Sequence, residues 1–212
     1  MHCLNQRPGI QEGKENSMKT LSKVSLIAAI TLLSAMLPVA AVSAARPASA
    51  GVASMTFSWH IGDDFLASVD PSFGVPSIAT ASLNGDMIAV KGTGTLSVHD
   101  MSVSGGGTFV HMDQSGNQKA SGTWEATKLL SFVTYGDGSA QGLPSTLFGG
   151  MAKMQVNLLV GGNVVHTGIL TIFCGLGNHV PHHVVSDGIT LNVQDAINFN
   201  KQVSGATVFV VS

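Results

Sequence analysis

The sequence predicts an all-β fold, a single antiparallel β-barrel or barrel-like β-sandwich that follows an N-terminal signal peptide. Apolar and polar residues alternate over many short segments, which is the pattern of strands with one buried face. Turn residues separate these segments at intervals of about 8–12 residues, and no amphipathic helix is evident. Glycine, valine, threonine and serine dominate after position 45, and glutamate occurs there once, as Glu125.

Residues 18–45 have the features of a secretory signal peptide. Lys19 and Lys23 precede an apolar run over residues 24–42, and small residues follow as far as Ala45. A charged start, an apolar centre and a small-residue cleavage site are the three parts of such a peptide. A membrane anchor is the alternative, since a run of about 19 residues can span a bilayer. We expect a secreted or extracytoplasmic protein of the cell envelope, with no membrane span after cleavage.

The signal peptide divides the chain into four expected segments. Residues 1–17 are polar and precede Met18, which resembles a natural start, so we interpret them as an N-terminal extension assigned in error. The signal peptide covers 18–45. Residues 46–52 then form a flexible mature N-terminus, and 53–212 form the single all-β domain.

The chain is poor in charge. Its 212 residues carry a formal net charge of −2, with 10% charged and 44% hydrophobic residues, whereas average globular chains are about 25% charged. This balance excludes intrinsic disorder, which needs low hydrophobicity and high charge. The chain also lacks the basic patch of a nucleic-acid-binding protein, so we expect no nucleic-acid partner.

Strands are predicted first from alternation in the N-terminal half of the domain. Phe57, Trp59 and Ile61 share one face of a strand over 55–61. Asn84-Gly85 predicts a tight hairpin, because both turn residues tolerate positive φ. The segments on either side of that turn are 79–83 and 88–90, and a further strand follows at 95–99.

A triple glycine, Gly105 to Gly107, precedes the strand at 108–112. It indicates a bulge, a bend or a close backbone approach. A phosphate-binding loop is the functional alternative, but neither the Lys-Ser/Thr pair nor the helical pattern of such a loop follows. The return strand over 119–135 places four residues inward on alternate positions: Trp124, Ala126, Leu130 and Phe132.

The C-terminal third continues the pattern. Gly161-Gly162-Asn163 predicts a second hairpin. The remaining expected elements are a long loop at 136–150 with a helical turn at 145–148, strands at 153–160, 164–173 and 189–193, an irregular segment at 175–183, a helical turn or bend at 193–199 and a terminal strand at 203–211. That last strand is apolar enough that it needs a pairing partner.

Several motifs give the chain a family resemblance. They are Gly92-Thr93-Gly94-Thr95, Gly105-Gly106-Gly107-Thr108-Phe109, the run GTWEATKLLSF over 122–132, and Ile197-Asn198-Phe199-Asn200. With them the chain resembles a group of small exported β-rich bacterial and archaeal proteins that have no assigned function. The resemblance implies a β fold and export, and it implies no activity. Relatives with a cysteine near Tyr135 would pair it with Cys174, but this chain has Asp137 there.

One cluster of residues has the chemistry of a metal site. Cys174 is followed by His179, His182 and His183, and imidazole and thiolate are ligands of zinc and copper. We take the three histidines as candidate ligands of zinc or copper. The alternatives are a polar surface loop for the histidines and a buried, inert thiol for Cys174.

Aspartate and histidine recur together at strand ends, where they could act as general acid and base. The groups are His60 with Asp63 and Asp64, His99 with Asp100, and His111 with Asp113. Asp-rich turns explain the same spacing without chemistry. Glu125 lies opposite Trp124 on its strand, so it faces either the surface or a barrel lumen.

These observations favour a non-enzymatic binding or interaction protein. Its ligand would be a small apolar molecule inside the barrel, or a partner at the surface. A barrel enzyme of the cyclase or isomerase type and a structural envelope protein are the two alternatives. No catalytic residues are assigned.

Overall fold

Antiparallel strands dominate the structure, as the alternation predicts. The computed structural model describes residues 55–182 and 187–211, all within the compact unit Ala45–Ser212. The elements in chain order are β1 (Thr56–Ile61), α1 (Asp64–Val69), η1 (Pro71–Gly74), β2 (Ser77–Thr80), β3 (Met87–Ser97), β4 (Ser102–Met112), β5 (Gln118–Asp137), η2 (Gly138–Gln141), β6 (Leu147–Val160), β7 (Asn163–Cys174), β8 (Gly188–Val193), β9 (Ile197–Phe199), β10 (Lys201–Ser204) and β11 (Thr207–Val211). The all-β prediction is confirmed.

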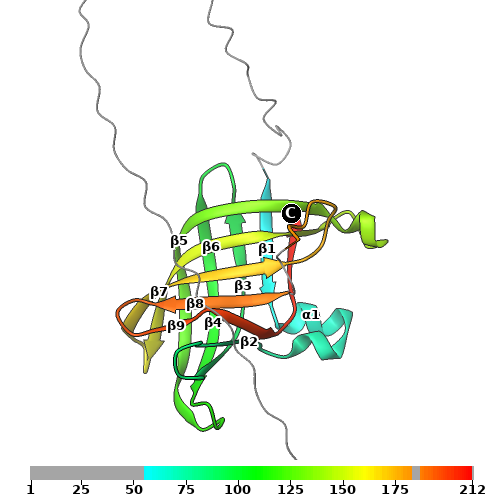
Figure 1. Cartoon of the computed structure of the whole chain (residues 1–212). Helices are drawn as coiled ribbons and strands as arrows, with labels where there is room; N and C mark the ends of the chain where they lie inside the picture. The colour runs from blue at the N-terminus through cyan, green and yellow to red at the C-terminus, as the bar shows by residue number, and fades with distance from the viewer. Residues whose placement is uncertain (1–54, 183–186, 212) are drawn as a thin grey trace, which may run out of the picture. The chain divides into compact units, whose positions relative to one another are not determined.

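The strands close into a ring, which makes the fold a barrel. Strand β1 pairs with β3 and with β11, and β4 and β5 lead from β3 to β6. Strand β6 pairs in turn with β11, so the hydrogen-bonded path returns to β1. Strands β7, β8 and β9 extend the wall from β6, and β2 and β10 extend it from β3. Figure 1 shows these strands curving around one axis, with α1 outside them.

Aromatic side chains fill the barrel centre. Phe57, Trp59 and Ile61 of β1 are fully buried, as their shared face predicts. The Trp59 and Trp124 rings stack with centroids 5.5 Å apart. The space left beside Trp124 is only about 10 Å³, which is too small for a ligand larger than a water molecule. Open space for a ligand must therefore lie at an end of the barrel or outside it.

Glycines of the paired strands β3 and β4 make room for the two tryptophans. The triple glycine lies inside β4 and pairs with Gly92 and Gly94 of β3. A Cβ atom at Gly94 would come within 2.5 Å of the Trp59 ring, and one at Gly92 within 2.5 Å of the Trp124 ring. Gly105 has φ +112, which side chains rarely adopt. The predicted close backbone approach is thus confirmed.

The prediction of an Asp-rich turn after β1 is wrong, because the segment forms the helix α1. The Asp63 carboxylate caps it by accepting a 3.2 Å hydrogen bond from the Leu66 amide, and Leu66 is buried. Six residues are too few for a visible helical period. Within the described ranges, no helix is long and apolar enough to span a membrane.

The first hairpin also differs from its prediction. Strands β2 and β3 do pair, but a loop over 81–86 joins them in place of a two-residue turn. Gly85 has φ +76, whereas Asn84 is not in the left-handed region. The side-chain oxygen of Asn84 instead accepts a 3.1 Å hydrogen bond from the Asp86 amide. This local hydrogen bond stabilises a wider loop.

Bulges change which residues of β5 face inward. The register shifts after Ala126 and again after Leu129. Leu129 is consequently 1% exposed, and Leu130, which alternation predicts to be buried, is 38% exposed. An added residue in one strand reverses the alternation beyond it.

Other differences concern element bounds. The helical turn predicted at 145–148 is absent from that segment, where β6 begins, and a turn of 3₁₀ helix lies at Gly138–Gln141 instead. Strand β3 runs unbroken through its glycines, whereas two strands were expected. The terminal strand divides into β10 and β11, and β11 has the pairing partners that its apolar character requires.

Candidate functional site

An apolar pocket of about 340 Å³, here called the mouth pocket, opens at one end of the barrel. The end of one strand and the start of the next meet there, because neighbouring strands are antiparallel. Its lining is Ile88, Phe109, His111, Ala120, Leu158, Val160, Val165, His166, Val193, Ala196, Ile197 and Phe199. The volume is within the range of small-molecule sites, and an apolar lining with few polar groups is their usual composition.

His111 is the polar group of this pocket that has a buried partner. Its Nε2 atom lies 2.9 Å from Oδ2 of Asp86, whose side chain is 6% exposed. Lys119 donates to the same oxygen at 2.8 Å. We call these three residues the Asp86 network. The Phe199 ring packs edge-on against His111, with centroids 5.3 Å apart, so the imidazole is held on two sides.

A bulge brings Lys119 to this network. His111 pairs with Ala120 and Met112 pairs with Gln118, which leaves Lys119 as the added residue of β5. A bulge re-aims the side chains around it, and here the long Lys119 side chain reaches Asp86 in the loop before β3. A second bulge lies across the pocket in β7, where Val165 is the added residue beside His166.

The network fixes the proton on His111. The hydrogen bond from Lys119 holds the pKa of Asp86 below its ordinary value, with help from His111 and against the opposing effect of burial. The carboxylate is therefore ionised at neutral pH and can only accept, so Nε2 of His111 must carry the hydrogen. In neutral His111 the Nδ1 atom is then an acceptor, and it has no hydrogen-bond partner among the described residues.

The sequence pairs His111 with the wrong aspartate. Asp113 accepts hydrogen bonds from the amides of Ser115 and Asn117 and stabilises the turn between β4 and β5. The true partner, Asp86, is 25 positions away. The contact arises from the register of β3 and β4. Ile88 pairs with His111, which brings the loop just before β3, and with it Asp86, beside the imidazole.

The other histidine–aspartate pairs lie apart from the mouth pocket. His60 Nδ1 is 2.6 Å from Asp63 Oδ2, and its ring stacks on Phe65. Because the same carboxylate caps α1, this pair joins β1 to the helix. His99 and Asp100 are exposed and 4.0 Å apart. Glu125 lies on the surface and accepts from Asn157 at 3.0 Å.

The proposed metal ligands are only partly within the described residues. His179 and His182 are exposed in the segment after β7, and His183 lies outside the described residues. Cys174 is fully buried in the core, as the inert-thiol alternative predicts, so it does not share their surface position. Burial, with the nearby Asp187 charge, raises the pKa of its thiol to about 12. In the described ranges, no three His, Cys, Asp or Glu residues are placed to hold a metal; the zinc or copper hypothesis stays a prediction.

A second apolar hollow, which we call the α1 groove, lies outside the barrel. It measures about 470 Å³ and separates α1 and η1 from the start of β11. Phe73 and Leu143 are exposed along it. Asp187 also lines the groove, and burial raises the pKa of its carboxyl group.

No family model matches the chain, and no curated protein and no solved structure gives a significant match.

Proposed function

We propose that this protein is an exported, non-enzymatic binding protein that holds a small, largely apolar molecule in its mouth pocket. The observation that carries the proposal is an apolar pocket with one imidazole fixed by a buried carboxylate. Ten of its lining residues are apolar, so desolvation would supply most of the affinity. His111 Nδ1 would accept one hydrogen bond, which favours a ligand with a single hydroxyl or amine donor.

Fluorescence titration tests the proposal. The probe is N-phenyl-1-naphthylamine, a neutral apolar molecule with one N–H donor whose emission rises in apolar surroundings. We expect one site with a Kd on the order of 1–10 μM. Val165→Glu places a charge at the pocket, and it should weaken binding at least about tenfold. Val165 is 47% exposed, so the variant should fold.

Val164→Glu is the matched control. Val164 precedes Val165 in β7, is 52% exposed and does not line the pocket. It should bind the probe like the unchanged protein. Val69→Glu, in the α1 groove, should also leave binding unchanged; loss of binding there would move the ligand to that groove and overturn the proposal. No saturable binding at all would favour a structural envelope protein.

A barrel enzyme of the isomerase or cyclase type is the second candidate. The observation that favours it is the same Asp86–His111 contact, since an oriented neutral imidazole is the usual general base. Apolar molecules extracted from the protein as purified from its producing cells distinguish the two functions. An enzyme would hold a different isomer when His111 is replaced by Gln, whereas a binding protein would hold the same molecule in a smaller amount.

A further inference from the structure

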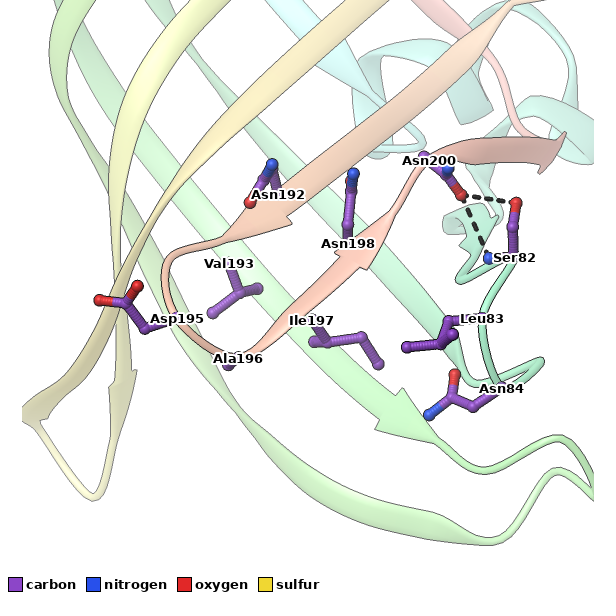
Figure 2. A pocket seen from close by; sticks show the side chains of 10 residues that line it. All are labelled: Ser82, Leu83, Asn84, Asn192, Val193, Asp195, Ala196, Ile197, Asn198 and Asn200. Carbon is purple, nitrogen blue, oxygen red and sulfur yellow. Dashed lines mark hydrogen bonds between the residues drawn. The ribbon is translucent and has the colours of Figure 1, made fainter.

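A hollow of about 760 Å³, which we call the amide hollow, lies between the β8–β9 hairpin and the loop that joins β2 to β3. Four asparagines and Ser82 are among its lining residues, and Figure 2 shows Asn192 and Asn198 projecting from one side of the hairpin, with Asn200 bonded to Ser82. Asp195 is the only ionisable residue among those that line it. Apart from Asp195, the polar groups of the hollow therefore carry no charge.

Two of the asparagines have free amide groups. Asn192 and Asn198 are opposite each other in the β8–β9 pairing, so their side chains leave the sheet on one face. Both are exposed. Neither side chain makes a hydrogen bond with any described residue. Together they offer four N–H donors and two carbonyl acceptors a few ångströms apart.

Asn200 extends this array and is held in place. Its side-chain oxygen accepts from the Ser82 amide at 3.1 Å and from the Ser82 hydroxyl at 2.7 Å. Both lone pairs of that oxygen are then used, so its amide hydrogens are left for a ligand. Asn200 follows Asn198 by two positions, and Phe199 between them is buried, so the two exposed side chains lie on the same side of the chain.

Aliphatic surface lies beside these amides. Leu83 is 97% exposed at the edge of the hollow, and Ile197 also lines it. A second hollow of about 480 Å³ shares Asn192 and Asp195 with the first. It adds Gln155, Thr167 and Gln194, together with the aliphatic Leu130 and Ile169. Apart from the shared Asp195, the polar lining thus stays uncharged across two adjoining hollows.

We propose that the amide hollow and its neighbour bind a neutral oligosaccharide. Sugar hydroxyls both donate and accept hydrogen bonds, as amide side chains do, and the C–H faces of sugar rings pack on aliphatic side chains such as Leu83. An anionic ligand would find no cation in the lining, and Asp195 would repel it. An added peptide strand is disfavoured because β9 is three residues long and its edge offers few backbone groups.

Isothermal titration calorimetry with the neutral hexasaccharides of glucose (α- and β-linked) and of N-acetylglucosamine tests the proposal. At least one should bind with a Kd of about 0.1–1 mM. The double variant Asn192→Ala/Asn198→Ala should weaken that binding at least about tenfold. Asn192→Asp/Asn198→Asp keeps the shape but removes the donors, so it should weaken binding too.

Asn163→Ala is the control, since Asn163 is the first residue of β7 and lines neither hollow. It should bind the saccharide unchanged, as should Val165→Glu in the mouth pocket, so this site and the mouth pocket fail or succeed separately. Absence of binding to all three saccharides overturns the proposal. So does stronger binding of polygalacturonate or of an extended peptide, or binding that survives both double variants in folded protein.

Discussion

Lys119 and Asp86 are joined by a 2.8 Å hydrogen bond between a half-exposed ammonium group and a nearly buried carboxylate. The same carboxylate oxygen accepts from His111. Lys119 alone would add little, because exposed ion pairs are weak. With His111 it lets an ionised aspartate remain buried, and that aspartate determines which His111 nitrogen carries the hydrogen. The tautomer of His111 in the mouth pocket thus depends on the Asp86 side chain.

Asp86→Asn should lower the free energy of unfolding by about 1–2 kcal/mol, because hydrogen bonds to a charged group are replaced by weaker ones. Urea denaturation followed by tryptophan fluorescence measures it, since Trp59 and Trp124 are buried. Asp100→Asn is the control: its side chain is 66% exposed, and the change should stay within about 0.5 kcal/mol. Equal effects of the two substitutions would contradict the role given to Asp86.

The contribution of Asp86 should also depend on pH. Its pKa is lowered in the folded protein, whereas an unfolded aspartate has a pKa of about 3.9. The unfolded state therefore binds the proton first, so the stabilisation is full above about pH 4 and is lost as pH falls through the lower folded pKa. Denaturation curves from pH 7 to pH 3 should show the gap between the unchanged protein and Asp86→Asn closing at the acid end. A constant gap would contradict the prediction.

The sequence predicts what depends on short-range pattern. Alternation places Phe57, Trp59 and Ile61 on one buried face, and turn residues locate the β6–β7 hairpin. It does not predict bulges, because one added residue changes the face of Leu130 without changing the composition of the strand. The partner of His111 is missed for the same reason. That contact needs the register between strands, whereas a local reading selects Asp113.

The mouth pocket and the amide hollow were also beyond prediction from the sequence. The mouth pocket takes residues from every strand from β3 to β9, and only the curvature of the sheet brings them together. Asn192 and Asn198 lie on opposite sides of a turn that the sequence predicts as a helical turn or bend. Their pairing appears once β8 and β9 are known to be antiparallel neighbours.

Gly94→Ala should destabilise the fold by about 3 kcal/mol or more, because its Cβ would overlap the Trp59 ring and the backbone of β4. Chemical denaturation or a lower thermal midpoint would report it. Gly116→Ala is the matched control: Gly116 has φ +84 but nothing within 4 Å of an added Cβ. That change should cost about 1 kcal/mol through backbone strain alone. Equal costs would show that the tryptophans do not require the Gly94 approach.

Cys174 should resist alkylation in the folded protein. Its side chain is fully buried, and burial raises the pKa of the thiol to about 12, so the reactive thiolate is nearly absent at pH 8. Iodoacetamide followed by mass spectrometry of the Cys174 peptide should show slow labelling in buffer and rapid labelling in guanidinium chloride.

The raised pKa of Cys174 should also make the free energy of unfolding depend on pH. Because the unfolded thiol ionises first, the stabilisation is full below about pH 8.5 and is lost as pH rises toward 12. Stability should therefore fall more steeply above pH 9 in the unchanged protein than in Cys174→Ala. Rapid labelling in buffer, or parallel pH profiles, would place the thiol outside the core.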